Sequence, residues 1–365
     1  TGSISRCPDG IDTNSNNVDL KYTPAKTPGY TNDCGALVDE ACGDPFTPIY
    51  SVQGDGLTSP LAETTVSVQG VVVGDFQNNA SADNGELNGV HLQDPDGDGN
   101  VLTSDGIFIL APGAIDVAAG DAVRVRGYVS EYYGMTEITA SQVWVCSSGN
   151  SVALSDLSLP VESVDDFEPY EGMLVRFLQP LTISEYFNYD QFGEIVLATY
   201  RHVTPTALAE PGSPWIADMA QEYLLERITL DDGRSEQNPD PAIHPNGLDF
   251  TLSNRFRGGD LLWDVTGVLE YGFGQYRIQP TTAAVYTENN PRPDQPPAVG
   301  GSLKVVSMNV LNYFTTLGSR GANTPEEFTR QRDKIITAIV KMNPDIAGLV
   351  EIENNDTALA NLVQG

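Results

Sequence analysis

The chain has 365 residues, of which 40% are hydrophobic, and a formal net charge of −31. This length suffices for two or three domains that each bury a core of their own. The acidic excess argues against a surface that attracts nucleic acid or anionic membranes, and it indicates either a need for solubility or adaptation to salt.

Three further features concern the compartment in which the protein works. No apolar run reaches the roughly 18 residues that a membrane span needs. No basic start followed by an apolar stretch marks a signal peptide, and a processed or truncated N-terminus would explain this equally well. The cysteines form no CxxC pair and have few histidines nearby, which argues against a zinc site. Their even number in a chain rich in Thr, Asn and Gly and poor in Lys favours disulfides and export.

Residues 1–45 are rich in turn-forming residues and have no periodic apolar pattern, as is typical of the closing edge of a domain. The even number of cysteines predicts two disulfides among Cys7, Cys34, Cys42 and Cys146. We favour Cys7–Cys34 with Cys42–Cys146, but three connectivities are possible and the sequence does not choose among them.

Residues 46–155 contain five segments in which apolar and polar residues alternate and glycines mark the bends. This pattern predicts five short strands that curl into a small barrel, such as an OB-fold. The predicted strands are TTVSVQGVVVGDF (64–76), GVHLQD (89–94), DGIFIL (105–110), AVRVRGYVSEYY (122–133) and MTEITASQVWVC (135–146).

An acidic loop, DPDGDGNVLTSD, connects the second and third of these strands. Its spacing is that of a calcium loop, with aspartates at positions one, three and five, glycine at six and a carboxylate at twelve. Strands flank it, so it is no EF-hand, and an acidic hairpin exposed to solvent is the alternative. The predicted Ca²⁺ ligands are Asp94, Asp96, Asp98, the backbone carbonyl of Asn100, and Asp105.

Residues 156–286 repeat the strand signals, and they contain an echo of the first region. The echoing segments are GDAVRVRGYVSEYYGMTEI (120–138) and GDLLWDVTGVLEYGFGQYRI (259–278), the second being one residue longer. They share a Gly-Asp start and three further matches: Gly127 with Gly267, Glu131 with Glu270, and Tyr132 with Tyr271. A second OB-like domain is therefore expected, and a chance similarity of two strand-turn-strand units is the alternative.

After a Pro/Gly-rich linker at residues 287–301, the pattern changes to strand, helix and strand. LKVVSMNV and DIAGLV are continuous apolar strands. The helix between them opens with a capping box of Thr324 and Glu327, with Pro325 at its first position. Such a βαβ unit has a right-handed crossover, which makes its strands parallel.

Asn309 and Glu351 close these two strands. Because the carboxyl ends of parallel strands lie along one edge of a sheet, where ligands of open α/β sheets bind, the two side chains should lie near each other. A carboxylate suits Mg²⁺, and an amide can orient a phosphate or a metal-bound water. The alternative is that both are polar residues that merely end strands at the surface.

The segments LKVVSMNVLNYF, RGANTPEEFTRQRDKI and DIAGLVEIENN resemble the start of an endonuclease/exonuclease/phosphatase domain, most closely in secreted bacterial nucleases of the ExeM/NucH type. Upstream, VQGDGLTSP, DGIFIL, YEGMLVRF and YRIQPT are similar to the OB-like region that precedes the nuclease domain in those proteins. Residues 1–34 resemble the tail of a lamin-tail domain, so residues 1–45 would be the C-terminal edge of such a domain. The resemblance thus extends over nearly the whole chain.

The resemblance implies a multidomain, mostly β protein that ends in the truncated first βαβ portion of an α/β sandwich, at residues 302–365. By position, Glu351 matches the metal-binding glutamate of the family, and Asn309 matches the asparagine that contacts metal or scissile phosphate. Val350 stands where many members have glutamine. The resemblance implies that the family's later Asp/Asn pair and its histidine base would lie beyond residue 365. The three histidines of this chain cannot replace that base, because all of them precede the linker.

The implied function is that of a secreted, extracellular endonuclease that uses Mg²⁺ or Mn²⁺ to hydrolyse phosphodiester bonds of DNA, or of RNA as well. With an incomplete catalytic domain, this stretch of chain would itself be inactive. A phosphomonoesterase or phospholipid phosphodiesterase of the same superfamily is one alternative. A calcium-stabilised extracellular binding module is an alternative from a different class, and the sequence does not indicate the oligomeric state.

Overall fold

The computed structural model describes residues 3–6, 20–23, 40–77, 87–111 and 115–365. The chain divides into two compact units, Thr1–Asn290 and Pro291–Gly365, and this boundary falls inside the Pro/Gly-rich linker. Near the N-terminus, β1 (Ser3–Arg6) pairs antiparallel with β2 (Leu20–Thr23). Most of the predicted lamin-tail edge, with Cys7 and Cys34 and their predicted disulfide, lies outside the described residues.

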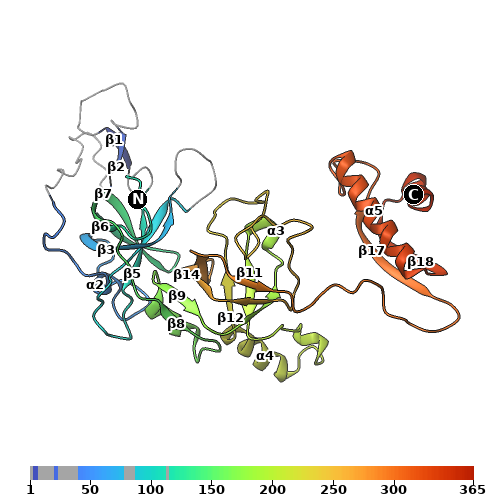
Figure 1. Ribbon diagram of the computed structural model, residues 1–365, viewed down its shortest axis with the longest axis horizontal. Coiled ribbons are helices and arrows are strands. Elements are labelled where there is room, and N and C mark those ends of the chain that lie inside the picture. Colours follow the sequence, from blue (N-terminus) through green and yellow to red (C-terminus); the bar gives the residue numbers. More distant parts are fainter. Residues whose placement is uncertain (1–2, 7–19, 24–39, 78–86, 112–114) are drawn as a thin grey trace. The chain divides into compact units, whose positions relative to one another are not determined.

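Five strands of the first unit close into a barrel in the order β3-β4-β5-β7-β6 (Figure 1). Neighbouring strands are antiparallel except β5 and β7, which are parallel. The strands bury alternate apolar side chains, and the short helix α2 (Ile49–Gln53) adds Ile49 and Val52 to the same core. All five predicted strands are confirmed: β3 (Thr65–Phe76), β4 (Gly89–Gln93), β5 (Gly106–Leu110), β6 (Ala122–Tyr132) and β7 (Met135–Ser147).

A disulfide and the contacts of Glu40 attach the segment before the barrel to its strands. Cys42 forms a disulfide with Cys146 on β7, which confirms this part of the preferred pairing. Glu40 accepts a hydrogen bond of 2.7 Å from the Nε of Arg124 and forms an ion pair of 3.1 Å with Arg126, both on β6. The disulfide joins residues 104 apart, and such a cross-link stabilises a fold by roughly 2–4 kcal/mol because it restricts the unfolded chain.

The rest of the first unit is built on a nine-stranded sheet in the order β16-β13-β10-β11-β12-β15-β14-β9-β8. Its strands are β8 (Ser155–Leu157), β9 (Leu174–Phe177), β10 (Leu181–Glu185), β11 (Ile195–Ala198), β12 (Arg227–Leu230), β13 (Leu261–Trp263), β14 (Val265–Gly272), β15 (Gln275–Pro280) and β16 (Val285–Thr287). The connections contain η1 (Val164–Tyr170), α3 (Tyr189–Phe192), η2 (Pro205–Ala207) and α4 (Pro214–Leu225).

The middle of this sheet repeats the strand order of the barrel. Only Asp264 separates β13 from β14, so the two act as one bent strand. Because β13 pairs with β10, the strands β10-β11-β12-β15-β14/β13 form a ring, which we call the second ring. Only β12 and β15 are parallel in it, as only β5 and β7 are in the barrel. The prediction of two related β units therefore agrees with the strand pairing.

The two echoing segments form equivalent hairpins, β6–β7 and β14–β15. Each is closed by a two-residue turn, Tyr133-Gly134 in the first and Phe273-Gly274 in the second. All four residues have positive φ angles, between 52° and 94°, as the tight turns that match the twist of a hairpin require.

Gly127 and Gly267 are equivalent when residues are counted from these turns, as the echo predicts. A Cβ at Gly127 would overlap the side chain of Ile138 and a backbone carbonyl of β7. A Cβ at Gly267 would overlap Ile278 and a backbone carbonyl of β15 in the same way. Glycine is therefore required at both positions because the facing strand passes too close for any side chain.

The extra residue of the second copy is Asp264, which interrupts the strand with a φ angle of 54°. Asp264 lies before the shared glycine. From that glycine to the turn, the two hairpins therefore match residue for residue. The predicted matches of Glu131 with Glu270 and of Tyr132 with Tyr271 are therefore wrong by one residue.

Hydrogen bonds connect the barrel to the chain that enters the second ring. The carboxylate of Glu171 accepts the N–H of Thr136 at 3.0 Å, and the backbone carbonyl of Glu171 accepts the hydroxyl of Ser104 at 2.6 Å. Gln93 on β4 accepts the N–H of Leu174 on β9 at 2.9 Å. These bonds are buried or half-buried, so the barrel and the sheet share one interface within the first unit.

The second unit is the predicted βαβ unit followed by a further helix. It consists of β17 (Val305–Tyr313), α5 (Pro325–Met342), β18 (Ile346–Ile352) and α6 (Asp356–Gln364). The strands are parallel, and the capping box of Thr324 and Glu327 is present, so both predictions are confirmed. The helices cover one face of the two strands (Figure 1). The opposite face exposes Val305, Ile346 and Val350, each by more than half of its surface.

Candidate functional site

The predicted catalytic pair lies on the two neighbouring parallel strands of the second unit. Asn309 on β17 is in register with Val350, the residue before Glu351 on β18. Both polar side chains are exposed. Regular pairing stops at this point, since the register shifts between Asn309 and Tyr313.

The backbone around this pair adopts a conformation that residues other than glycine rarely occupy. Leu311, Asn312 and Glu351 have φ angles of 53°, 51° and 63°. Each left-handed residue of this kind costs roughly 1–2 kcal/mol, and such outliers gather at active sites and ligand clamps. Asn309 fixes the bend, because its Oδ1 accepts the N–H of Leu311 at 2.7 Å.

Glu353, two residues after Glu351, has a structural role. Its carboxylate accepts the backbone N–H groups of Thr315 and Thr316 at 2.7 and 3.1 Å and bonds both hydroxyls as well. These hydrogen bonds lower the pKa of Glu353 to about 2. The side chain of Glu351 has no hydrogen bond or ion pair with any residue in the part of the chain that the structure describes, so its carboxylate is available to a ligand.

The pair fits part of a magnesium site. Mg²⁺ in proteins is held by one or two carboxylates and keeps several waters, and substrate phosphates complete its shell. Glu351 and the side-chain amide of Asn309 offer oxygens of the right hardness. Among residues 3–6, 20–23, 40–77, 87–111 and 115–365, no group of three or more histidine, cysteine or acidic side chains is placed to hold a metal.

The predicted calcium loop folds on itself through turns made by its own aspartates. Asp94 accepts the N–H groups of Asp96 and Gly97 at 3.1 and 3.3 Å. Asp98 accepts the N–H of Asn100 at 2.8 Å. The carbonyl of Asn100, a predicted ligand, accepts a hydrogen bond of 3.4 Å from the N–H of Thr103, and Asp96 is exposed.

Asp105 closes the loop, and its Oδ1 is buried without a hydrogen-bond partner among the described residues. Burial, together with the charges of Asp98 and Asp94, raises its pKa to about 6. Gly97 lies against this carboxylate so closely that a side chain there would overlap it. Asp94 and Asp98 thus lie near enough for their charges to act on Asp105, but these three side chains are not placed as a metal-holding group. A cation would stabilise the buried carboxylate of Asp105.

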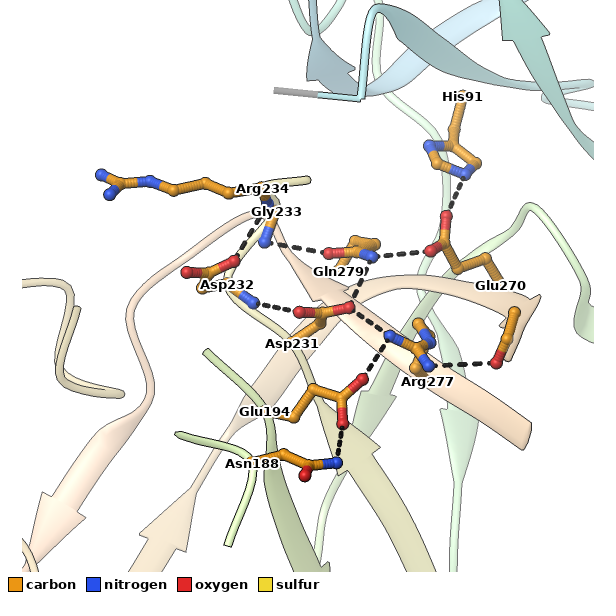
Figure 2. Close-up of polar contacts among 11 residues, drawn as sticks. His91, Asn188, Glu194, Asp231, Asp232, Gly233, Arg234, Glu270, Arg277 and Gln279 are labelled. Atoms are coloured by element: carbon orange, nitrogen blue, oxygen red, sulfur yellow. Dashed lines mark hydrogen bonds and ion pairs between the residues drawn. The ribbon is translucent and has the colours of Figure 1, made fainter. Parts of the chain in front are cut away.

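A buried polar network within the second ring was not predicted from the sequence (Figure 2). Arg277 on β15 is its centre. Its Nη1 donates to Asp231 at 2.6 Å and to Glu194 at 2.9 Å, and its Nη2 donates to the carbonyl of Gly272 at 3.0 Å. Arg277 is 2% exposed and Asp231 is 7% exposed. These bonds compensate the desolvated charges. The Nε of Arg277 is buried and has no hydrogen-bond partner among the described residues.

The network continues through Gln279 to the barrel. The Nε2 of Gln279 donates to Asp231 at 3.2 Å and to Glu270 at 2.6 Å. Glu270 in turn faces His91 of β4, with 3.5 Å between Oε2 and Nε2. His91 is fully buried between two phenylalanine rings. This chain of contacts joins the second ring to the barrel, so its role is to hold the first unit together.

One signal in the sequence points to this network. Arg277 and Gln279 are two residues apart on β15, so their side chains lie on the same face of the strand. Ile278, which lies between them and pairs with Leu269, points to the opposite face. Two long polar side chains on alternate positions of an otherwise apolar strand predict a buried polar cluster. The partners Asp231 and Glu194 cannot be found in this way, because they lie 46 and 83 residues away along the chain.

Residues 136–290 match a protein family described as a domain of unknown function (DUF8508). The match begins in β7, contains the whole nine-stranded sheet and ends at the boundary of the first unit. No curated protein matches the chain. Among the described residues, no helix combines the length and the apolar character that crossing a membrane would require. What is established is thus a mostly β protein whose central part is similar to that family.

Proposed function

We propose that residues 302–365 belong to a metal-dependent phosphodiesterase domain that hydrolyses nucleic acid outside the cell. Glu351 would be a ligand of Mg²⁺ or Mn²⁺, and Asn309 would bind the scissile phosphate or a metal-bound water. The observation that carries this proposal is the placement of two exposed polar side chains on neighbouring parallel strands, where the backbone departs from regular geometry.

The distribution of charge supports nucleic acid as the substrate. Residues 302–365 contain nearly as many basic as acidic side chains, although the whole chain carries a net charge of −31. The acidic excess therefore lies upstream of this unit, and the unit itself does not repel a polyanion strongly. A phosphate backbone can approach it more readily than it can approach the rest of the chain.

The chemistry assigned to the chain's own residues is limited to binding and orientation. A bound divalent cation would supply charge stabilisation at the phosphoryl oxygens. The Glu351 carboxylate would hold that ion at the edge of the strands. Asn309, held by its bond to Leu311, would present its amide in one orientation, so the approach of the phosphate would cost less conformational entropy.

The upstream β units fit an OB-type architecture in this proposal. The order β3-β4-β5-β7-β6, with only β5 and β7 parallel, supports that assignment for the barrel, and the second ring supports it by repetition. The Cys42–Cys146 disulfide supports an extracellular location, because disulfides persist in oxidising compartments.

The test is hydrolysis by the protein at its full natural length, with MgCl₂ or with EDTA, on supercoiled plasmid DNA. Glu351→Gln should lower the rate on the order of a hundredfold or more, since it removes a charge that the cation needs. Glu326→Gln is the matched control, because Glu326 is exposed and belongs to α5 rather than to either strand of the pair. Wild-type rates for Glu351→Gln would refute the assignment. Faster turnover of p-nitrophenyl phosphate than of plasmid would assign the phosphomonoesterase alternative, and faster turnover of phospholipid vesicles would assign the phospholipid phosphodiesterase alternative.

We further propose that the loop at residues 94–105 binds Ca²⁺, which would make the barrel a calcium-stabilised extracellular module. The observation that favours this is the buried, unpartnered Oδ1 of Asp105 beside Asp94 and Asp98. A divalent cation would relieve the repulsion among these carboxylates and supply the missing partner. The shorter reach of aspartate at the twelfth position predicts a weak site, with a Kd of roughly 10⁻⁴–10⁻³ M.

A further inference from the structure

A cavity of about 260 Å³ lies at one end of the second ring. Its wall includes the first residue of β11 and the last of β12, and the first residue of β14 and the last of β15. The loop 243–247 forms another part of the wall. This loop is held in place by two hydrogen bonds of 2.9 Å, from the hydroxyl of Tyr189 to the carbonyl of Ile243 and from the N–H of Ala284 to the carbonyl of Pro245. The mouth of a β ring is a common place for a ligand.

The lining of this cavity combines apolar side chains with a few polar groups. Its apolar part includes Ile195, Leu230, Ile243, Val265 and Pro280. Its polar side chains are Asp231, Asp232, His244, Thr266, Thr281 and Thr282. Among the described residues that line it there is no lysine or arginine to receive a phosphate or carboxylate, and no phenylalanine, tyrosine or tryptophan to stack on a base. The lining therefore disfavours anionic and nucleotide ligands.

Asp232 differs from its neighbour in having a free oxygen. Asp231 is fully engaged with Arg277, Gln279 and the backbone N–H of Asp232. Asp232 uses its Oδ1 to accept the N–H of Arg234 at 3.0 Å, but its Oδ2 is buried and has no partner among the described residues. A buried acceptor without a donor is destabilising unless a ligand or water supplies the donor.

We propose that this cavity binds a small organic cation, whose ammonium group donates to the Oδ2 of Asp232 while its hydrocarbon body packs against Ile195, Leu230 and Val265. An ammonium group supplies both the missing donor and a counter-charge. The threonine hydroxyls of the wall can accept its remaining N–H bonds. This site is separate from the phosphodiesterase proposal, because all of its residues belong to the first unit.

The charged groups around Asp232 predict how binding depends on pH. Burial and the neighbouring Asp231 raise the pKa of Asp232 to about 7, and the nearby charge of Arg234 acts in the opposite direction. Arg234 extends its side chain away from the rest of the network (Figure 2). Burial lowers the pKa of His244 and raises that of Tyr189, so both are neutral near pH 7. A cation prefers the ionised carboxylate, so binding should tighten as the pH rises through 7.

The test is calorimetric titration of the whole chain with cyclohexylammonium chloride, beside cyclohexanol and cyclohexanecarboxylate. Only the cation should bind. Its affinity should rise about tenfold from pH 6 to pH 8, since the ionised fraction of a carboxyl with a pKa of about 7 rises from roughly one tenth to nine tenths over that range. This pH profile needs no variant, so it decides the matter even where a substitution unfolds the protein.

Asp232→Asn should reduce the affinity at pH 8 at least tenfold, while keeping the Oδ1 acceptor for Arg234. Asp218→Asn on the exposed side of α4 is the control and should bind as the wild type does. Equal binding of cyclohexanol, no heat with any probe, or wild-type affinity in a folded Asp232→Asn protein would each overturn the proposal. Displacement of cyclohexylammonium by CaCl₂ at constant ionic strength would assign the cavity to a metal instead, and would also overturn it.

Discussion

The Nη1 of Arg277 lies 2.6 Å from the carboxylate of Asp231, and both side chains are almost completely excluded from water. The same nitrogen is 2.9 Å from Glu194. The guanidinium thus neutralises two carboxylates from other parts of the sheet, Asp231 just after β12 and Glu194 just before β11. Removing the cation would leave these charges buried without compensation.

We therefore expect Arg277→Met to lower the free energy of unfolding of the first unit by about 3–5 kcal/mol. Adding Asp231→Asn should recover part of this loss, because the uncompensated charge is then removed. The control is Arg176→Met, whose ion pair with Asp156 is partly exposed and should contribute less than about 1 kcal/mol. Urea denaturation followed by circular dichroism measures both. Equal losses in the two variants would show that the Arg277 network has no special role.

The second prediction concerns the glycines shared by the two hairpins. Gly127→Ala and Gly267→Ala should each destabilise the first unit by about 1–3 kcal/mol, because the new methyl group overlaps the facing strand. Gly56→Ala is the matched control, since nothing lies near a Cβ there and the φ angle is not left-handed. Thermal melts of the three variants test this. A neutral effect at Gly267 would mean that β14 and β15 can move apart.

The third prediction is that calcium stabilises the barrel. At millimolar CaCl₂ the gain should be on the order of 1 kcal/mol, and EDTA should abolish it. Asp98→Ala should remove the difference, whereas Asp55→Asn, in another exposed loop, should keep it. If calcium does not change the melting temperature, residues 94–105 form an acidic hairpin that binds no ligand.

The calcium effect should also depend on pH. The pKa of Asp105 is about 6 in the folded protein and 3.8 in the reference state. Asp105 therefore binds its proton more tightly in the folded state, and this proton stabilises the folded state fully below about pH 4. The stabilisation is lost as the pH rises through 6. Calcium, which prefers the ionised carboxylate, should therefore raise the melting temperature more at pH 7.5 than at pH 5. The reverse order would exclude Asp105 as a ligand.

The fourth prediction concerns the linker and the exposed face of the second unit. Strands of parallel sheets are normally covered on both faces, but Val305, Ile346 and Val350 are exposed. Limited proteolysis should therefore cleave within 291–301 and then digest residues 302–365 faster than the first unit. Mass spectrometry of the fragments over time tests this order. Equal resistance on both sides of the linker would contradict it.

Much of the fold could be predicted from local patterns. The five barrel strands follow from alternation, and the start of α5 follows from Thr324 and Glu327, because these signals act over a few residues. The echo predicted the two hairpins and the place of Gly127 and Gly267. Its matches beyond that glycine are wrong by one residue, because the extra residue, Asp264, already lies before the glycine and the two hairpins have equal length after it.

The candidate sites were harder to predict, since they depend on distant partners. Nothing near Glu194 or His91 in the sequence indicates that they meet Arg277 and Glu270. Glu351 and Glu353 look alike in sequence, and only the hydrogen bonds of Thr315 and Thr316 distinguish the structural glutamate from the available one.

The buried bonds of Glu171 to Thr136 and Ser104 have a consequence for how this protein can be dissected. A fragment that starts at residue 136, where the family match begins, would keep most of β7 but lose β5 and β6, the two strands that pair with it. It would also lose Ser104, one of the two partners of Glu171. The segment that matches the family and the segment whose parts are held together by buried bonds therefore have different borders. If residues 136–290 were transferred into a new protein, a surface of that protein would have to replace the missing strands. Otherwise the unpaired edges of β7 would promote aggregation.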